Sequence, residues 1–202
     1  MSRVVVADSA GLNAAVAALR TGGLVGFPTD TVYGLGALAT SARSRGRLWA
    51  AKRRPQAQPA ILMVARPWEV EPWVVLDDRA RSFIAEYWPG ALTLVLRATG
   101  RASVQLGEVV SGGTLAVRIP AHSTALALLE AASAPLATSS ANRTGMPAPT
   151  TALQAAEALP GDVDLLLDGE APLGVASSIL DLSRPEPRVL REGSIPARRL
   201  LR

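Results

Sequence analysis

The chain of 202 residues is long enough for one domain with a full hydrophobic core, and two domains would be a tight fit. Hydrophobic residues make up 49% and charged residues 19%, which excludes disorder as the main state, while a net charge of +4 suits phosphate-bearing ligands, nucleic acid or a generally cationic surface. The lack of cysteine excludes thiol nucleophiles, zinc thiolate sites and disulfides, and the single histidine argues against a serine–histidine triad.

The first half of the chain alternates between helical and extended patterns. Apolar residues recur at helical spacing between Ser9 and Gly22, which predicts a helix over residues 10–21 that Ser9 would cap. The apolar stretch from Val4 to Val6 is too short for a signal peptide, and no run reaches membrane-spanning length, so we expect a cytoplasmic protein without membrane contact. The next predicted elements are a strand at 24–27, a loop at 28–36, a helix at 41–52, a strand at 61–64, a helix around 80–87 and a strand around 92–96.

The second half carries more strands than helices. Leu115, Val117 and Ile119 alternate with other residues, so the strand that they predict places Arg118 on the opposite face. Ser123 is expected to cap the helix that follows. Also predicted are a strand at 135–139, a loop at 142–149, a helix from 150 or 151 to about 161, strands at 165–167, 178–182 and 189–191, and a short helix capped by Ser194. This order predicts a single-domain α/β protein with a mixed, twisted open sheet and flanking helices.

Three hydroxyl side chains, Thr29, Thr31 and Tyr33, follow directly after a predicted strand. Ligand sites in open α/β sheets lie at such strand ends, and hydroxyls both donate and accept hydrogen bonds. Gly34 and Gly36 would let the backbone approach a ligand closely. The segment fits either a binding loop for a ligand with amine and hydroxyl groups or an ordinary strand-to-helix turn.

Basic side chains near two predicted element ends are candidates for binding anions. Lys52 and Arg54, at the end of a predicted helix, would neutralise a polyphosphate, although cations also simply complement a helix C-terminus. Arg118 would clamp a carboxylate if its face of the strand floors a cleft, and would be a solvated strand residue otherwise. His122 stands beside a predicted helix cap, which fits a structural hydrogen bond better than a general base.

Hydroxyl and amide side chains gather near three later strand ends. Thr138, Ser140 and Asn142 lie at and just after the end of one predicted strand, and residues 174–178 and 191–193 also carry polar side chains. Such loops bind phosphate, ribose or base edges through side chains and backbone N–H groups. Serine and asparagine are also common in turns, where they bond to their own backbone.

Seven segments, taken in order, resemble the YrdC-like family of threonylcarbamoyl-AMP synthases. They are FPTDTVYGLGA (27–37), AKRRP (51–55), WPGALTLVL (88–96), TLAVRIPAH (114–122), ATSSANRTGMPAP (137–149), GVASSILDL (174–182) and VLREG (189–193). The shared order makes the resemblance specific, and it covers about residues 10–195. It implies one YrdC-like domain over residues 1–202, with a twisted open α/β sheet and a large basic cavity. The extra C-terminal domain of longer members is expected to be missing.

The resemblance also implies a reaction. L-threonine, bicarbonate and ATP would yield threonylcarbamoyl-adenylate and pyrophosphate, and a separate tRNA threonylcarbamoyl-transferase complex would pass the group to adenosine 37 of tRNA. Because a carbamate oxygen attacks the α-phosphate, no covalent nucleophile on the enzyme is expected, and catalysis rests on alignment and charge neutralisation. Mg²⁺ would be carried by the ATP phosphates. Direct contact with tRNA is left open.

Carried over residue by residue, the resemblance implies two sets of contacts. The L-threonine-binding positions are Thr29, Arg118, Thr138 and Ser177. The ATP-binding positions are Lys52, Arg54, Thr114, Ser140, Asn142 and Arg191. Within these sets, Arg118 would hold the threonine carboxylate, and Lys52 with Arg54 would hold the phosphates.

Four positions depart from the common pattern of that family. Asp30 replaces a glutamate, Ala60 a leucine, Ala176 an acid and Glu192 a proline. The lost acid at Ala176 leaves the local network around Ser177 in question. The changes at Ala60 and Glu192 would alter the shape of the cavity without removing a named ligand group.

Two other functions remain open on the sequence. A paralogue that adenylates groups derived from carbamoyl phosphate would share the fold, but the chain carries none of the zinc-binding or acylphosphatase segments of the larger carbamoyltransferases. A non-catalytic RNA-binding module would use the basic cavity. Against it, only four Trp, two Tyr and two Phe are available for base stacking, and a carboxylate clamp is unnecessary for backbone binding.

Overall fold

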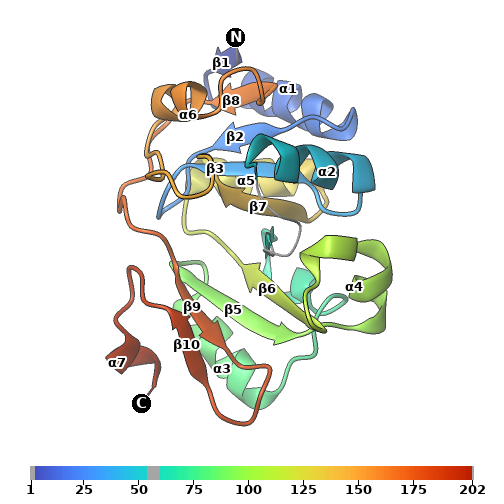
Figure 1. Ribbon diagram of the computed structural model, residues 1–202, viewed down its shortest axis with the longest axis vertical. Coiled ribbons are helices and arrows are strands. Elements are labelled where there is room, and N and C mark those ends of the chain that lie inside the picture. The colour runs from blue at the N-terminus through green and yellow to red at the C-terminus, as the bar shows by residue number, and fades with distance from the viewer. Residues whose placement is uncertain (1–2, 54–59, 202) are drawn as a thin grey trace.

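One mixed β-sheet forms the centre of the molecule in the computed structural model, which describes residues 3–53 and 60–201 (Figure 1). Its strands are β1 (Arg3–Val5), β2 (Val25–Phe27), β3 (Gly34–Leu38), β4 (Ile61–Met63), β5 (Leu92–Arg97), β6 (Thr114–Arg118), β7 (Leu136–Ser140), β8 (Leu165–Leu167), β9 (Ser178–Asp181) and β10 (Arg188–Arg191). They neighbour one another in the order β1-β8-β2-β3-β7-β4-β6-β5-β9-β10. Parallel pairs such as β4 and β6 lie beside antiparallel pairs such as β5 and β6, so the predicted mixed open sheet is confirmed.

Helices cover both faces of this sheet. They are α1 (Ser9–Arg20), α2 (Ala42–Ala51), α3 (Asp78–Tyr87), α4 (Gly100–Gln105), α5 (Ser123–Ala132), α6 (Ala152–Ala158) and α7 (Ala197–Leu200). Figure 1 shows α1 and α5 behind the upper strands and α2 in front of them. Apolar side chains of α1 and α5 share one buried cluster, while those of α2, α3, α4 and α6 belong to a second and larger one. Within the described ranges, no helix has the length and apolar character needed to cross a membrane.

The predicted caps of two helices are wrong by one residue. Asp8, not Ser9, caps α1, and its carboxylate accepts a backbone N–H at 2.8 Å. His122, not Ser123, caps α5, and its Nδ1 accepts a backbone N–H at 3.2 Å. In both cases the residue before the predicted cap has the extended backbone and the acceptor atom that an N-cap requires.

Three further differences concern short segments. Gly34–Gly36 was predicted as loop but lies in β3, which pairs antiparallel with β2, so the polar turn joins two strands rather than a strand and a helix. The short elements β1 and α4 have no counterpart among the sequence predictions. Ser194 does not cap a helix, because α7 starts after Pro196, which offers no side-chain acceptor.

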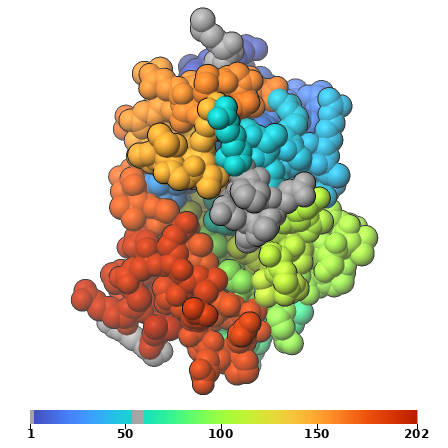
Figure 2. Space-filling model, viewed as in Figure 1, coloured from blue at the N-terminus to red at the C-terminus, as the bar shows by residue number. Residues whose placement is uncertain are grey.

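A long connection links the two ends of the sheet. After β8, residues 168–177 run down the left side of the molecule in the view of Figure 1 to reach β9. The space-filling view shows the same orange segment lying against its neighbours on that side (Figure 2). This connection brings Ser177 beside β5, which lies much earlier in the chain.

Candidate functional site

A cavity of about 260 Å³ opens on one face of the sheet, and residues of β3, β4, β5, β6, β7, β9 and β10 line it. Its polar and charged lining residues are Thr29, Thr31, Arg118, Thr138, Ser139, Ser140, Ser177 and Arg191. Six of the ten residues predicted from the sequence are therefore together here: Thr29, Arg118, Thr138, Ser140, Ser177 and Arg191. A volume of this size suits a small polar ligand or part of a larger one.

Strand β6 places Arg118 in the cavity through simple alternation. Leu115 and Val117 face the buried core, while Ala116 and Arg118 face the cavity. Arg118 is only 2% exposed, so the alternative of a solvated strand residue is wrong. The expectation that the opposite face of this strand floors a cleft is confirmed.

The Arg118 guanidinium is held by three acceptors on different segments. Nη2 donates to the Asp30 carboxylate at 2.7 Å, Nη1 to the Thr31 hydroxyl at 2.8 Å, and Nε to the Gly90 carbonyl at 2.9 Å. A guanidinium has five N–H donors, so two are left without an acceptor among the described residues. Burial lowers the pKa of Arg118, the charge of Asp30 opposes this, and the nearby charge of Arg191 adds to the lowering.

The turn that follows β2 supports this arginine through a chain of hydroxyls. Thr29 Oγ1 donates to the Val32 carbonyl at 2.7 Å and lies 3.0 Å from Thr31 Oγ1. Since the proton of Thr29 is used in that way, the Thr31 hydroxyl donates to Thr29 and accepts from Arg118. Tyr33 differs, because its buried hydroxyl donates to the Leu167 carbonyl at 2.5 Å, and burial raises its pKa. Thr29 and Thr31 are therefore the hydroxyls of this turn that line the cavity.

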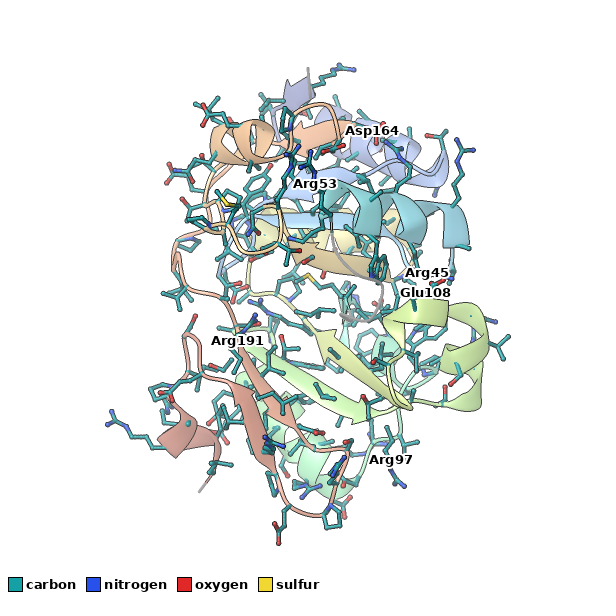
Figure 3. All side chains as sticks on the ribbon, viewed as in Figure 1. Arg45, Arg53, Arg97, Glu108, Asp164 and Arg191 are labelled. Atoms are coloured by element: carbon teal, nitrogen blue, oxygen red, sulfur yellow. The ribbon has the colours of Figure 1, made fainter. Side chains whose placement is uncertain are left out.

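Ser177 and Arg191 form a second polar group in the same cavity. Arg191 donates to the Ser177 carbonyl at 3.0 Å through Nε and to the Ser177 hydroxyl at 3.2 Å through Nη2. Thr93, a fully buried residue of β5, lies 2.8 Å from the same hydroxyl. Figure 3 shows Arg191 reaching from β10 toward the middle of the molecule. The network around Ser177 is intact although Ala176 carries no acid.

Sequence reasoning missed Thr93. The one available signal was a hydroxyl residue at the centre of an otherwise aliphatic strand, Leu92–Arg97. Its partner Ser177 lies 84 residues away, so only the neighbouring positions of β5 and β9 bring the two together.

Lys52 contacts the loop after β7. Its ammonium donates to the carbonyl oxygens of Ser140 and Asn142, both at 2.5 Å, and the residue is 4% exposed. The Asn142 side chain in turn donates to the Met146 carbonyl at 2.5 Å. Lys52 and Asn142 thus shape the loop that presents Ser140, and neither lines the cavity. Their contact with phosphates stays a prediction.

Two other predicted residues lie apart from the cavity or outside the described ranges. Thr114 begins β6 and lines a separate hollow with Arg97, Asp181 and Arg184. It shares a sheet face with Ala116 and lies two residues before it in the strand, which corresponds to about 7 Å. Arg54 falls outside the described residues.

The chain is similar to proteins of known families over most of its length. The family model named Sua5_yciO_yrdC, described as "Telomere recombination", matches residues 17–193. A protein of Pyrococcus abyssi named "Threonylcarbamoyl-AMP synthase" is 41% identical over 182 residues, which are 88% of this chain and 52% of that protein. The chain therefore spans about half the length of this relative.

Two further comparisons cover more of the chain. A protein of Mycobacterium tuberculosis named "Putative threonylcarbamoyl-AMP synthase" is 39% identical over 194 residues, which are 95% of this chain and 88% of that protein. The crystal structure of P. abyssi Sua5 complexed with L-threonine superposes with a TM-score of 0.90 at 35% identity, covering 99% of this chain and 59% of that one. The likeness in fold thus extends over nearly every residue of the chain.

Proposed function

The chain belongs to the Sua5/YciO/YrdC family, and from this we propose that it is an enzyme that converts L-threonine, bicarbonate and ATP into threonylcarbamoyl-adenylate and pyrophosphate. Two relatives that are 41% and 39% identical to it over the aligned residues are named "Threonylcarbamoyl-AMP synthase" and "Putative threonylcarbamoyl-AMP synthase". In this proposal the enzyme acts as a nucleotidyltransferase, because it transfers the AMP part of ATP to a carbamate.

The observation that carries the proposal is the buried Arg118 in the cavity. Its two remaining donors suit the two oxygens of a carboxylate, which guanidinium groups bind in a bidentate manner. The hydroxyls of Thr29, Thr138 and Ser177 lie around the same space and suit the hydroxyl and amine of L-threonine. A site built mainly to track a nucleic acid backbone would not require a buried, pre-bonded arginine.

The chemistry needs alignment more than a reactive side chain. Addition of the threonine amine to bicarbonate releases water and leaves an N-carboxylate. One oxygen of this carbamate attacks the α-phosphorus of ATP, and the bond to the β-phosphate bridging oxygen breaks, so that pyrophosphate leaves. The charges of Arg118 and Arg191 would neutralise part of the negative charge that gathers in this step.

Mg²⁺ and the nucleotide are further parts of the proposal. ATP would contact the loop that Lys52 and Asn142 shape, with Ser140 at its edge and Arg191 opposite. The carboxylate next to the cavity, Asp30, is bonded to Arg118, so Mg²⁺ would be held by phosphate oxygens and water. The metal would neutralise the triphosphate charge and favour departure of pyrophosphate.

The product is a mixed anhydride of a carbamic and a phosphoric acid. Such compounds transfer their acyl group readily, so an acceptor reaction must follow quickly. We propose that a tRNA threonylcarbamoyl-transferase complex consumes it to modify adenosine 37 of tRNA, in the cytoplasm. Direct binding of tRNA by this chain is a separate expectation.

The decisive experiment measures pyrophosphate release from ATP with bicarbonate, in the presence and absence of L-threonine. Arg118→Lys keeps a cation beside Asp30 but loses the planar fork, so kcat/KM for L-threonine should fall at least about tenfold. Arg20→Lys, an exposed change at the end of α1, is the matched control and should have no effect.

Other outcomes would replace this proposal. Release that ignores L-threonine but rises with carbamoyl phosphate would favour the carbamoyl-adenylating paralogue. If nothing turns over and the protein binds tRNA with an affinity that falls steeply with salt, the RNA-binding module is the better explanation.

A further inference from the structure

The Asp30 carboxylate stands against the guanidinium that we propose to hold the substrate. Its Oδ1 accepts hydrogen bonds from Arg118 Nη2 at 2.7 Å and from the Ala121 backbone N–H at 3.1 Å. Its carbonyl accepts from the Leu173 N–H at 3.3 Å, and the residue is 7% exposed. Asp30 is therefore fixed by two segments besides its own.

We infer that Asp30 is a positioning residue for Arg118, which keeps the guanidinium oriented so that its remaining donors are ready for the substrate carboxylate. The inference rests on the proposed function for the identity of that substrate. It assigns a role to the acidic position of the segment PTDT, where aspartate stands in place of the commoner glutamate.

The geometry supports orientation as the main effect. An arginine side chain has many rotamers, and fixing it on binding costs conformational entropy when nothing holds it beforehand. Here Asp30, Thr31 and Gly90 each occupy a different nitrogen of the group, so the plane of Arg118 is set before any ligand arrives. Asp30 is the charged acceptor of the three and makes the shortest bond.

Charge alone would have the opposite effect to orientation. Arg118 and Arg191 both lie in the cavity, and Asp30 reduces the positive charge that they present. If charge governed the binding of a carboxylate, removing Asp30 would strengthen it. If orientation governs, removing Asp30 weakens the binding although the site becomes more positive. The sign of the change therefore separates the two explanations.

The test compares three substitutions at this position by calorimetric titration with L-threonine and with ATP. Asp30→Ala loses both charge and acceptor, and should raise the Kd for L-threonine about tenfold or more. Asp30→Asn keeps an acceptor oxygen and should raise it about two- to fourfold. Asp30→Glu restores the commoner side chain and should stay within about threefold of wild type. The Kd for ATP should change less than that for L-threonine in every variant.

A control variant and a control ligand exclude a general structural defect. Glu108→Gln disturbs the ion pair between the Glu108 carboxylate and Nε of Arg45, a different buried arginine, which are 3.1 Å apart. Neither residue lines the cavity, so L-threonine binding should not change. L-threoninol has the amine and hydroxyl of threonine but no carboxylate. Asp30→Ala should bind it as weakly as wild type does, because the carboxylate contact is missing in both. A loss of equal size for L-threonine and L-threoninol would overturn the inference.

Two outcomes separate this inference from the proposed function. Wild type that binds L-threonine, with Asp30→Ala and Asp30→Asn binding it equally well or better, overturns the inference alone. Wild type that neither binds L-threonine nor releases pyrophosphate overturns the proposed function. In either that case or the case that Asp30→Ala does not fold, the Nε proton of Arg118 is followed by NMR. Its exchange with water should be slow in wild type and faster in Asp30→Asn, and equal rates would overturn the inference.

Discussion

Replacing Lys52 by methionine tests whether the loop after β7 depends on this ammonium group. Methionine keeps a long apolar side chain but removes the charge and all three N–H donors. The carbonyl oxygens of Ser140 and Asn142 would each lose a hydrogen bond of 2.5 Å. Because Lys52 is 4% exposed, water has little access to replace them.

The expected loss of stability follows from these two bonds. A hydrogen bond to a charged group contributes about 1.5–3 kcal/mol. Two of them give at least about 3 kcal/mol, and we take the lower end because burying the ammonium is itself costly. For a domain of this size, 1 kcal/mol shifts the unfolding temperature by about 2–4 °C, so Lys52→Met should unfold about 6–12 °C lower than wild type.

Thermal unfolding followed by circular dichroism measures this shift, with Arg53→Ala as the control. Arg53 is an exposed neighbour with a left-handed backbone conformation. This conformation costs arginine and alanine about the same free energy, so Arg53→Ala should unfold within about 2 °C of wild type. An unfolding temperature of Lys52→Met within 2 °C of wild type would refute the reasoning. Lys52 would then act through ligand contact and not through the loop.

Three smaller perturbations test other parts of the same argument. The pKa of Glu108 is lowered in the folded protein, first by a hydrogen bond from its own backbone N–H and then by Arg45. The Glu108 carboxylate therefore stabilises the fold at a pH above the pKa that it has in the unfolded chain, and this stabilisation is lost as the pH falls through its pKa in the folded protein. Glu108→Gln should therefore lower the unfolding midpoint in urea at pH 7 and have no effect at a pH below the folded pKa. Thr93→Val leaves the Ser177 hydroxyl with one partner fewer and should destabilise by about 1–2 kcal/mol, measured in the same urea titration. Gly193→Ala would place Cβ 2.6 Å from the Ser177 carbonyl carbon, so the backbone at Ser177 would have to shift and pyrophosphate release should fall at least about tenfold. Activity equal to that of wild type would contradict this expectation, because it would show that the backbone around Gly193 and Ser177 accommodates the methyl group.

The sequence was informative wherever a local pattern determined the outcome. The alternation of Leu115 and Val117 with other residues predicted which face of β6 Arg118 would take, and the structure confirms that it lines a cavity. Helix ends were less accurate, because Asp8 and His122 accept the capping hydrogen bonds in place of the serines that follow them. Period and polarity thus locate an element well and its first residue poorly.

Contacts between distant segments were beyond any local pattern. Asp30 meets Arg118 across 88 residues, and Thr93 meets Ser177 across 84. Each contact depends on which strands become neighbours, and the order of the sheet does not follow the order of the chain. The side chains that line the cavity were therefore easier to predict than the side chains that hold them in place.

The pairing of the first strand has a consequence for synthesis of the protein. Arg3 on β1 lies opposite Leu165 on β8, so the N-terminal strand pairs with residues that are made 162 positions later. A ribosome adds about 5–20 residues per second, so β1 waits roughly 8 to 32 s for its partner. During that time its backbone groups are available to any other extended segment. The charge of Arg3 makes such premature pairing less favourable until β8 emerges.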